Sequence, residues 1–227
     1  MYELIIANKN YSSWSMRPWV LMRAVDIPFT ERLLPFHLNH GAGDFRRFSP
    51  TGRVPCLVDG ELRIWDSLAI TEYLAERHAQ VWPPAAAARA FARSAAAEMH
   101  SGFGALRSHC SVNIGLRLRL RTQPPELGKD LSRLQELWAE GLSRFGGPWL
   151  AGDRFTAADA FYAPVATRVQ TWNLEVDATS RGYAERLLAH PAVKEWIDAG
   201  VRETFRDEGH DRECLAHAEL LQDLRSR

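Results

Sequence analysis

Residues 54–74, VPCLVDGELRIWDSLAITEYL, contain two short strand-like runs, a tight turn and the start of a helix. Cys56–Val58 and Leu62–Ile64 flank the pair Asp59-Gly60, and an Asp-Gly pair between two apolar runs is typical of a type I′ β-hairpin. From Ser67 onward, apolar residues recur on or near one helical face. The segment therefore predicts a hairpin that is followed directly by a helix.

Upstream of the hairpin, the chain has the order of a β-α-β unit. Leu4–Ala7 is a short apolar run suited to a strand, Trp19–Val25 has helical spacing, and Phe29–Leu34 suits a second strand. Together with the hairpin and its helix, residues 1–80 predict a domain of the α/β class.

The second half of the chain differs from the first in its residue pattern, which favours helices throughout. Val81–Pro84 ends the preceding helix, because a prolyl ring removes a hydrogen-bond donor and restrains the residue before it. Residues 81–88 therefore predict a linker. Residues 89–227 contain one helix-prone run after another, for example Leu131–Leu142, and predict an all-helical domain. The last stretch, 207–227, has mixed charge and predicts either a terminal helix or a frayed end.

Composition excludes several classes of protein. The 227 residues include 28 Lys or Arg and 28 Asp or Glu. The chain therefore lacks the net positive charge that is typical of proteins that bind nucleic acid or an anionic membrane. Cys56, Cys110 and Cys214 lack the spacing of a metal site or a disulfide framework, and we expect no metal. A basic leader and a run of about 18 apolar residues are both absent. We expect a cytoplasmic protein without nucleic-acid or membrane partners.

A serine cluster precedes the first helix, in the segment Asn10–Pro18 (NYSSWSMRP). Pro18 should lie no later than the third helical position, because only first-turn N–H groups lack an intrahelical partner. Ser15 is then the predicted N-cap, which leaves Ser12 and Ser13 just outside the positive end of the helix. A hydroxyl held there can donate to an anion such as a thiolate. Ordinary turn and capping roles are the alternative, and the Gly-x-Ser-x-Gly elbow of a serine hydrolase is absent.

A second candidate site surrounds the hairpin. Arg53-Val54-Pro55 puts a proline at the first position of a strand, where the Val54 backbone can pair with a peptide-like ligand if the Val54–Pro55 bond is cis. Asp66 and Ser67 begin the next helix. Ser67 and the first-turn N–H groups suit a carboxylate, and Asp66 suits an ammonium group. The pair matches the α-amino acid end of a ligand, although N-capping explains the dipeptide by itself.

In this order, the motifs resemble those of cytosolic glutathione S-transferases, with the nearest likeness to serine-type bacterial and zeta-like members. Trp14 and Pro18 depart from the zeta pattern, which has Cys and Val there. The matching segments are Ser12–Arg17, Val54–Leu57, Asp66–Leu74 and Gly152–Asp159. In the last of these, the pair Thr156 and Asp159 is also typical of a capping box.

The resemblance covers both halves of the chain. It implies a thioredoxin-like, glutathione-binding domain of order βαβ-α-ββα over residues 1–80, and an all-helical electrophile-site domain over 89–227. It also implies that Ser12 or Ser13 hydrogen-bonds the glutathione sulfur. Zeta-like members favour the position of Ser12 and theta-like members that of Ser13, and the neighbouring Tyr11 is a further candidate.

For the rest of glutathione, the resemblance implies that Val54, beside a cis Pro55, pairs with the cysteinyl portion. Asp66 and Ser67 would hold the γ-glutamyl end. Lys9 and His40 could approach the glycine carboxylate, but neither belongs to a matching motif. The implied glutathione-binding set also includes Ser15, Arg17 and Arg53.

The second substrate is expected between the domains, near a helix that carries His100, Phe103 and Arg107. These residues fall roughly along one helical face. An aromatic ring with Arg and His suits a small electrophile that is hydrophobic or anionic, and the polar boundary of an amphipathic helix is the alternative. Cys110 could face the electrophile or belong to the core.

The resemblance implies an enzyme, a homodimeric glutathione transferase of detoxification type, with glutathione as co-substrate and no metal. The glutathione thiolate would attack an electrophilic carbon. The alternatives are a glutathione-dependent isomerase or reductase of the same fold, or a non-catalytic protein that binds glutathione for interaction or storage.

Overall fold

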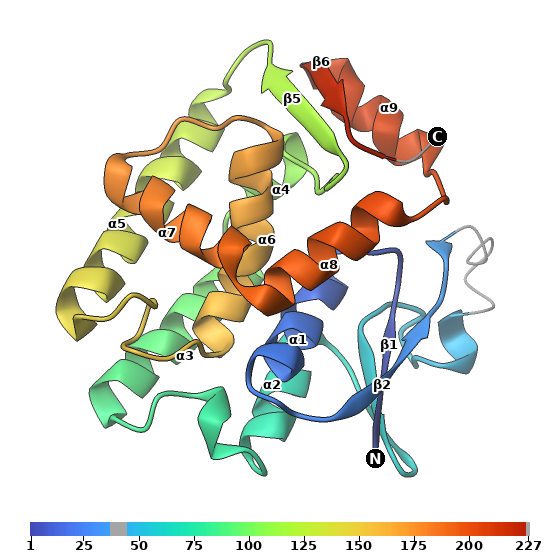
Figure 1. Ribbon diagram of the computed structural model, residues 1–227, viewed down its shortest axis with the longest axis vertical. Helices are drawn as coiled ribbons and strands as arrows, with labels where there is room; N and C mark the ends of the chain where they lie inside the picture. Colours follow the sequence, from blue (N-terminus) through green and yellow to red (C-terminus); the bar gives the residue numbers. More distant parts are fainter. Residues whose placement is uncertain (37–44, 226–227) are drawn as a thin grey trace.

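The N-terminal half of the chain contains a four-stranded mixed sheet (Figure 1). The computed structural model describes residues 1–36 and 45–225. The strands are β1 (Tyr2–Ile6), β2 (Phe29–Leu33), β3 (Cys56–Asp59) and β4 (Leu62–Ile64), in the order β2-β1-β3-β4. β1 is parallel to β2 and antiparallel to β3, which is antiparallel to β4. Helices α1 (Ser13–Ala24) and α2 (Ser67–Ala75) pack with it. The thioredoxin-like expectation is confirmed.

Between β2 and β3, the described residues contain the 3₁₀ turn η2 (Phe45–Arg47). A second turn, η3 (Ala79–Val81), follows α2 and leads into the proline-rich segment before the next helix.

The hairpin of β3 and β4 forms where the sequence predicts it, but its turn is of another type. Asp59 pairs with Leu62, so Gly60 and Glu61 are the two central residues of the turn. Gly60 has a φ of +59°, whereas Glu61 is not among the residues of positive φ. A type I′ turn requires positive φ at both central positions, so that prediction is wrong. The glycine moves to the first central position because Asp59 remains in the strand.

The start of α1 also differs from its prediction. Ser12, not Ser15, is the N-cap, since its Oγ accepts a hydrogen bond from the Ser15 N–H at 3.4 Å. Pro18 consequently lies inside the helix rather than in its first turn. Proline there removes one intrahelical hydrogen bond, and burial of residues around it offsets that loss, because Met16, Trp19 and the proline itself are buried. Tertiary packing has overridden the local rule.

The C-terminal half surrounds a central helix, α6, which is buried along nearly its whole length. Asp159 accepts a hydrogen bond from the Thr156 N–H at 2.9 Å, as the capping-box motif predicts. It also accepts from the Leu150 N–H at 2.9 Å and from the Tyr183 hydroxyl at 2.8 Å, two bonds that the motif does not predict. The helices are α3 (Ala86–Ser101), α4 (Gly104–His109), α5 (Pro125–Phe145), α6 (Ala157–Thr171), α7 (Ala178–Ala189), α8 (Pro191–Arg202) and α9 (Glu208–His217).

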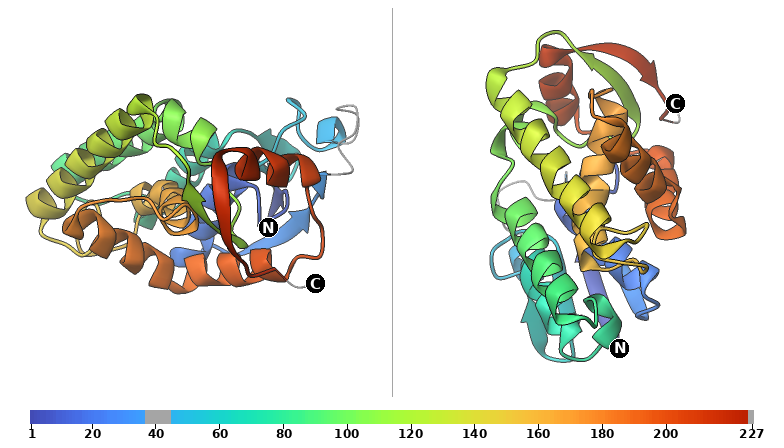
Figure 2. Two further views of the ribbon diagram at one scale, coloured as in Figure 1. Left: turned by 90° about the horizontal axis from the view of Figure 1, so that it is seen from above. Right: turned by 90° about the vertical axis from the view of Figure 1, so that its left-hand side faces the viewer.

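One feature of this half is not helical. β5 (Leu116–Leu120) and β6 (Ala218–Asp223) form an antiparallel ribbon beside α9, at the end of the molecule opposite the N-terminus (Figures 1 and 2). The domain is helical as expected, but the ribbon is an addition. The last stretch of the chain is therefore neither a plain terminal helix nor a frayed end.

The two halves meet along α1, which packs against α6 and α8 (Figure 1). The rings of Trp19 and Trp196 are in edge contact, with 5.3 Å between their centroids. The Trp196 Nε1–H donates to the Lys9 carbonyl at 3.0 Å. Over the described residues, no helix combines the length and the apolar character that crossing a bilayer would require.

Candidate functional site

A cleft between the two halves contains two adjoining cavities, which share Trp14, Arg53 and Val54. The first has a volume of about 540 Å³ and is lined by Tyr11, Ser12, Ser13, Trp14, Phe36, Phe45, Gly52, Arg53, Val54, Arg107, Ser111, Val112, Arg168 and His210. The second has about 680 Å³ and is lined by Trp14, Thr51, Arg53, Val54, Pro55, Trp65, Asp66 and His100. The serine cluster and the Val-Pro and Asp-Ser motifs thus meet at one cleft.

The two candidate serines differ in what their hydroxyls do. Ser12 donates from Oγ to the Ser15 Oγ at 2.8 Å, and Ser15 also accepts from the Ala7 N–H at 3.3 Å. Ser13 is the first residue of α1, and its hydroxyl has no partner among the described residues. The Trp14 N–H, one position further on, is also unpaired within the described chain. Two unpaired donors therefore lie at the positive end of α1, on residues that line the first cavity.

Ser15 and Arg17, which the resemblance assigns to glutathione, line neither cavity. Both are buried. The Arg17 guanidinium lies 4.1 Å from the centroid of the Trp14 ring and 5.0 Å from that of Phe161. Burial, with Arg168 and Arg107 nearby, lowers the pKa of Arg17 to about 9. Both residues support the wall of the cleft from behind.

Val54 lines both cavities. The Val54–Pro55 peptide bond is cis, and neither the N–H nor the C=O of Val54 has a partner among the described residues. Pro55 is buried next to the first residue of β3, and the exposed Arg53 lines both cavities. A peptide-like ligand could pair with Val54 here as with the edge of a sheet.

At the start of α2, Asp66 serves as the N-cap. Its Oδ1 accepts from the Leu68 and Ala69 N–H groups at 2.9 and 3.3 Å, and its Oδ2 lies 3.2 Å from the His100 Nε2. These first-turn donors are thus occupied, contrary to the expectation that they await a carboxylate. Ser67 is fully buried, and its Oγ has no hydrogen-bond partner in the described structure. An unpaired buried hydroxyl is uncommon, and a ligand or a bound water would satisfy it.

The residues expected to contact the electrophile are separated by the fold. Arg107 lines the first cavity, and its Nη1 donates to the His100 carbonyl at 2.9 Å. His100 lines the second cavity, and burial lowers its pKa although Asp66 opposes the shift. Phe103 lines neither, because it is buried at the N-terminus of α4 with a φ of +53°.

Other groups at the cleft come from distant parts of the chain. Arg168 on α6 and His210 on α9 line the first cavity, and sequence analysis did not single them out. Tyr11, a candidate for the sulfur, uses its hydroxyl elsewhere: the hydroxyl accepts from the Asp207 N–H at 3.1 Å and donates to the Asp211 Oδ1 at 3.3 Å. Lys9 forms an ion pair with Glu31 at 2.7 Å.

His40 lies outside the described residues. The three cysteines are free and buried, so Cys110 belongs to the core rather than to the electrophile wall. Burial raises the pKa of Cys110 and of Cys214 to about 12 and also raises that of Cys56. These thiols are poor nucleophiles at neutral pH. Among the described residues, no group of three or more His, Cys, Asp or Glu side chains could hold a metal ion.

Comparison with known protein families identifies both halves. Residues 11–77 match the glutathione S-transferase N-terminal domain, and residues 83–199 match the C-terminal domain of the same family. The chain belongs to the glutathione S-transferase family.

Individual relatives are distant but extend over most of the chain. Glutathione S-transferase 1 of Dianthus caryophyllus is 27% identical over 197 residues, which cover 84% of this chain and 82% of the relative. Glutathione S-transferase GstB of Escherichia coli K12 is 28% identical over 207 residues, covering 83% and 95%. A Burkholderia glutathione transferase homologue, solved with bound glutathione, superposes with a TM-score of 0.64 at 22% identity, covering 88% of this chain and 97% of that one.

Proposed function

We propose that this family member is a glutathione transferase that holds the glutathione sulfur as a thiolate at Ser13. The observation that carries the proposal is the contrast between the two serines. Ser12 uses its proton to bond Ser15, whereas the Ser13 hydroxyl and the Trp14 N–H are unpaired in the described structure, and both residues line the first cavity. Among serine-type members, this supports the theta-like position of the hydroxyl over the zeta-like one.

The energetics are sufficient for the role. A free thiol has a pKa of about 8.5, and one pKa unit corresponds to about 1.4 kcal/mol. A hydrogen bond to a charged group contributes roughly 1.5–3 kcal/mol, so one hydroxyl lowers the thiol pKa by about one to two units. Most of the bound thiol would then be ionised at neutral pH.

The remaining contacts would fix the tripeptide. Val54 would pair with its cysteinyl portion, the unpaired Ser67 hydroxyl and Asp66 would face its γ-glutamyl end, and the exposed Arg53 would approach a carboxylate. The thiol proton leaves to solvent. The sulfur then donates an electron pair to the electrophilic carbon, and the leaving group departs with the electrons of the broken bond. The protein's contribution is positioning and electrostatic stabilisation.

We also propose a homodimer, a cytoplasmic location and a role in detoxification. In support of a partner subunit, Leu62 and Trp65 are large apolar residues that are 54% and 44% exposed next to α2. Sedimentation analysis would distinguish a dimer from a monomer.

Calorimetry with glutathione and steady-state assays with 1-chloro-2,4-dinitrobenzene test the proposal together. We expect saturable glutathione binding at or below millimolar concentration and glutathione-dependent release of chloride. Failure to bind glutathione at millimolar levels would contradict the proposal. Binding with silence toward aryl halides and peroxides would instead favour a non-catalytic glutathione-binding protein, and turnover of peroxides alone would favour a reductase.

A further inference from the structure

Arg168 is a buried cation at the wall of the first cavity. It belongs to α6, is 3% exposed, and donates from Nε to the Cys110 carbonyl at 2.8 Å and from Nη1 to the Pro164 carbonyl at 3.2 Å. No carboxylate forms an ion pair with it in the part of the chain that the structure describes. Nη2 likewise has no partner there.

Two more arginines add to this positive charge. Arg107 lines the same cavity and stacks 5.5 Å from the centroid of the Trp14 ring, and Arg17 lies behind that ring. Neither forms an ion pair with a described residue. Burial is the main cause that lowers the pKa of Arg168 to about 10, and the nearby Arg107 acts in the same direction. With pKa values of about 9 and about 10, Arg17 and Arg168 remain charged at neutral pH.

Two acidic groups near the cleft already have side-chain partners. Asp66 lies against His100 at 3.2 Å and caps α2. Asp211 is held by Arg225 at 2.6 Å. A buried cation without a counter-charge is costly, and proteins normally pair it with a carboxylate or another anion. The cavity that opens onto Arg168 and Arg107 supplies room for such an anion from a ligand.

Glutathione would meet this charge only with its sulfur if it is seated as proposed above. Its peptide portion would follow Arg53, Val54 and Asp66 along the N-terminal half, whereas Arg107 and Arg168 come from the C-terminal half on the other wall of the cavity. The cation pair is therefore left for the second substrate.

We infer that the electrophile carries a carboxylate, which Arg168 and Arg107 bind while the thiolate at Ser13 attacks the reactive carbon. This inference rests on the proposed transferase function and narrows its substrate class. The planar guanidinium suits a carboxylate, since two parallel hydrogen bonds can form with it. A neutral electrophile of the same shape would leave the cation unpaired.

A matched pair of substrates tests this directly: 4-chloro-3,5-dinitrobenzoate and its methyl ester. With either one, the glutathione sulfur forms a C–S bond, the C–Cl bond breaks, and chloride leaves with the electron pair. Each kcat/KM is divided by the rate constant of the uncatalysed reaction with glutathione at the same pH, which removes the difference in intrinsic reactivity. We expect this normalised value to be at least about tenfold higher for the carboxylate, as one charge-assisted hydrogen bond would give.

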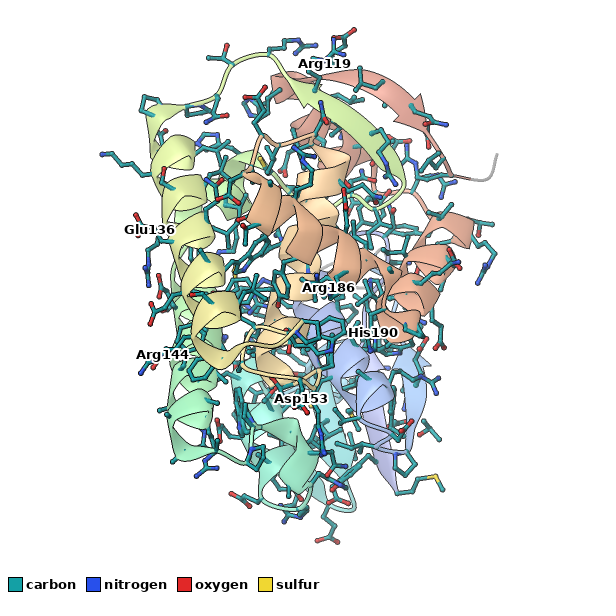
Figure 3. The ribbon with its side chains drawn as sticks, turned by 60° about the vertical axis from the view of Figure 1, so that its left-hand side comes forward. Arg119, Glu136, Arg144, Asp153, Arg186 and His190 are labelled. Carbon is teal, nitrogen blue, oxygen red and sulfur yellow. The ribbon has the colours of Figure 1, made fainter. Side chains whose placement is uncertain are left out.

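Variants assign the preference to the two arginines. Arg107→Met and Arg168→Met should each bring the carboxylate-to-ester ratio toward one, and Arg168→Lys should retain part of the preference. Arg144→Met is the control, since Arg144 is an exposed residue at the end of α5 that pairs with Glu140 (Figure 3). If Arg168→Met does not fold, the carboxylate-to-ester ratios of the unmodified protein and of Arg107→Met still test the inference.

Three outcomes separate the possibilities. Equal normalised rates for the two substrates in the unmodified protein would overturn the inference and leave the transferase function intact. A loss of glutathione affinity in Arg107→Met, with the ratio unchanged, would assign the cation to glutathione and also overturn it. If glutathione binds but neither substrate reacts, the proposed function itself fails.

Discussion

Two buried serine hydroxyls, those of Ser67 and Ser180, have no hydrogen-bond partner in the described structure. Ser67 lines neither cavity, but it directly follows Asp66, which lines the second one. Ser67→Ala should weaken glutathione binding about tenfold, because a bound carboxylate would lose one hydrogen bond of roughly 1–1.5 kcal/mol. The unliganded protein should keep its melting temperature, since no internal bond is lost. Calorimetry and thermal denaturation provide the two readouts.

Ser180→Ala is the matched control for that experiment. Ser180 is equally buried but lies on α7 in the C-terminal half, so its loss should leave glutathione affinity unchanged. Equal effects of the two substitutions on affinity would contradict a ligand role for Ser67.

Among individual residues, the sequence predicted those on the N-terminal side of the cleft and missed several on the C-terminal side. The serine, Val-Pro and Asp-Ser motifs meet because short connections hold them at one end of the sheet. Arg168 and His210 were missed because their approach to Ser13 depends on the packing of α6 and α9. One feature of the sequence could have indicated Arg168: it is a charged residue within the apolar run FYAPVATRV, and charged residues are seldom buried without a partner. Phe103 failed as a site residue because the helix expected to carry it is interrupted at Gly102.

Among the elements, α8 has an N-cap that titrates. His190, labelled in Figure 3, accepts the Ala192 N–H at its Nδ1 at 3.3 Å, and burial lowers its pKa. The unfolded chain therefore binds the proton more readily than the folded chain. Stability should be full above the unfolded pKa of about 6.5 and should fall as the pH drops below it.

His190→Asn keeps a capping acceptor that does not titrate. We expect its melting temperature to fall less than that of the unmodified protein between pH 7 and pH 5, with the difference growing as the pH decreases. Parallel pH profiles for the two proteins would show that this cap is not linked to protonation.

The helices and strands that the sequence predicts correctly are those whose signals lie within a few neighbouring residues. The hairpin and α2 follow from turn chemistry and helical spacing within a few residues. The start of α1 was misplaced because buried packing tolerates Pro18 inside the helix. The β5–β6 ribbon was overlooked although Leu116–Leu120 reads LRLRL, an alternation typical of a strand, because its partner strand lies about a hundred residues away.

For the whole molecule, the cleft exists because α1 is shared by both halves. Its N-terminal end supplies the serines, and its sides pack on α6 and α8, which fixes the C-terminal half over the first cavity. The C-terminal segment is tied to the same cavity through Tyr11, whose hydroxyl bonds with Asp207, Asp211 and Arg225. The two domains could be predicted from the change in residue pattern along the sequence. The placement of Arg107 and Arg168 at one cavity could not, because it depends on how the helices pack.

The pKa of the enzyme-bound glutathione thiol, followed by the ultraviolet absorbance of the thiolate during a pH titration, tests thiolate stabilisation at Ser13. In the unmodified protein it should lie at least about one unit below the free-thiol value of roughly 8.5. Ser13→Ala should return it toward that value, whereas Ser12→Ala should mainly destabilise α1 by about 1 kcal/mol. An unchanged thiol pKa in Ser13→Ala would contradict the account.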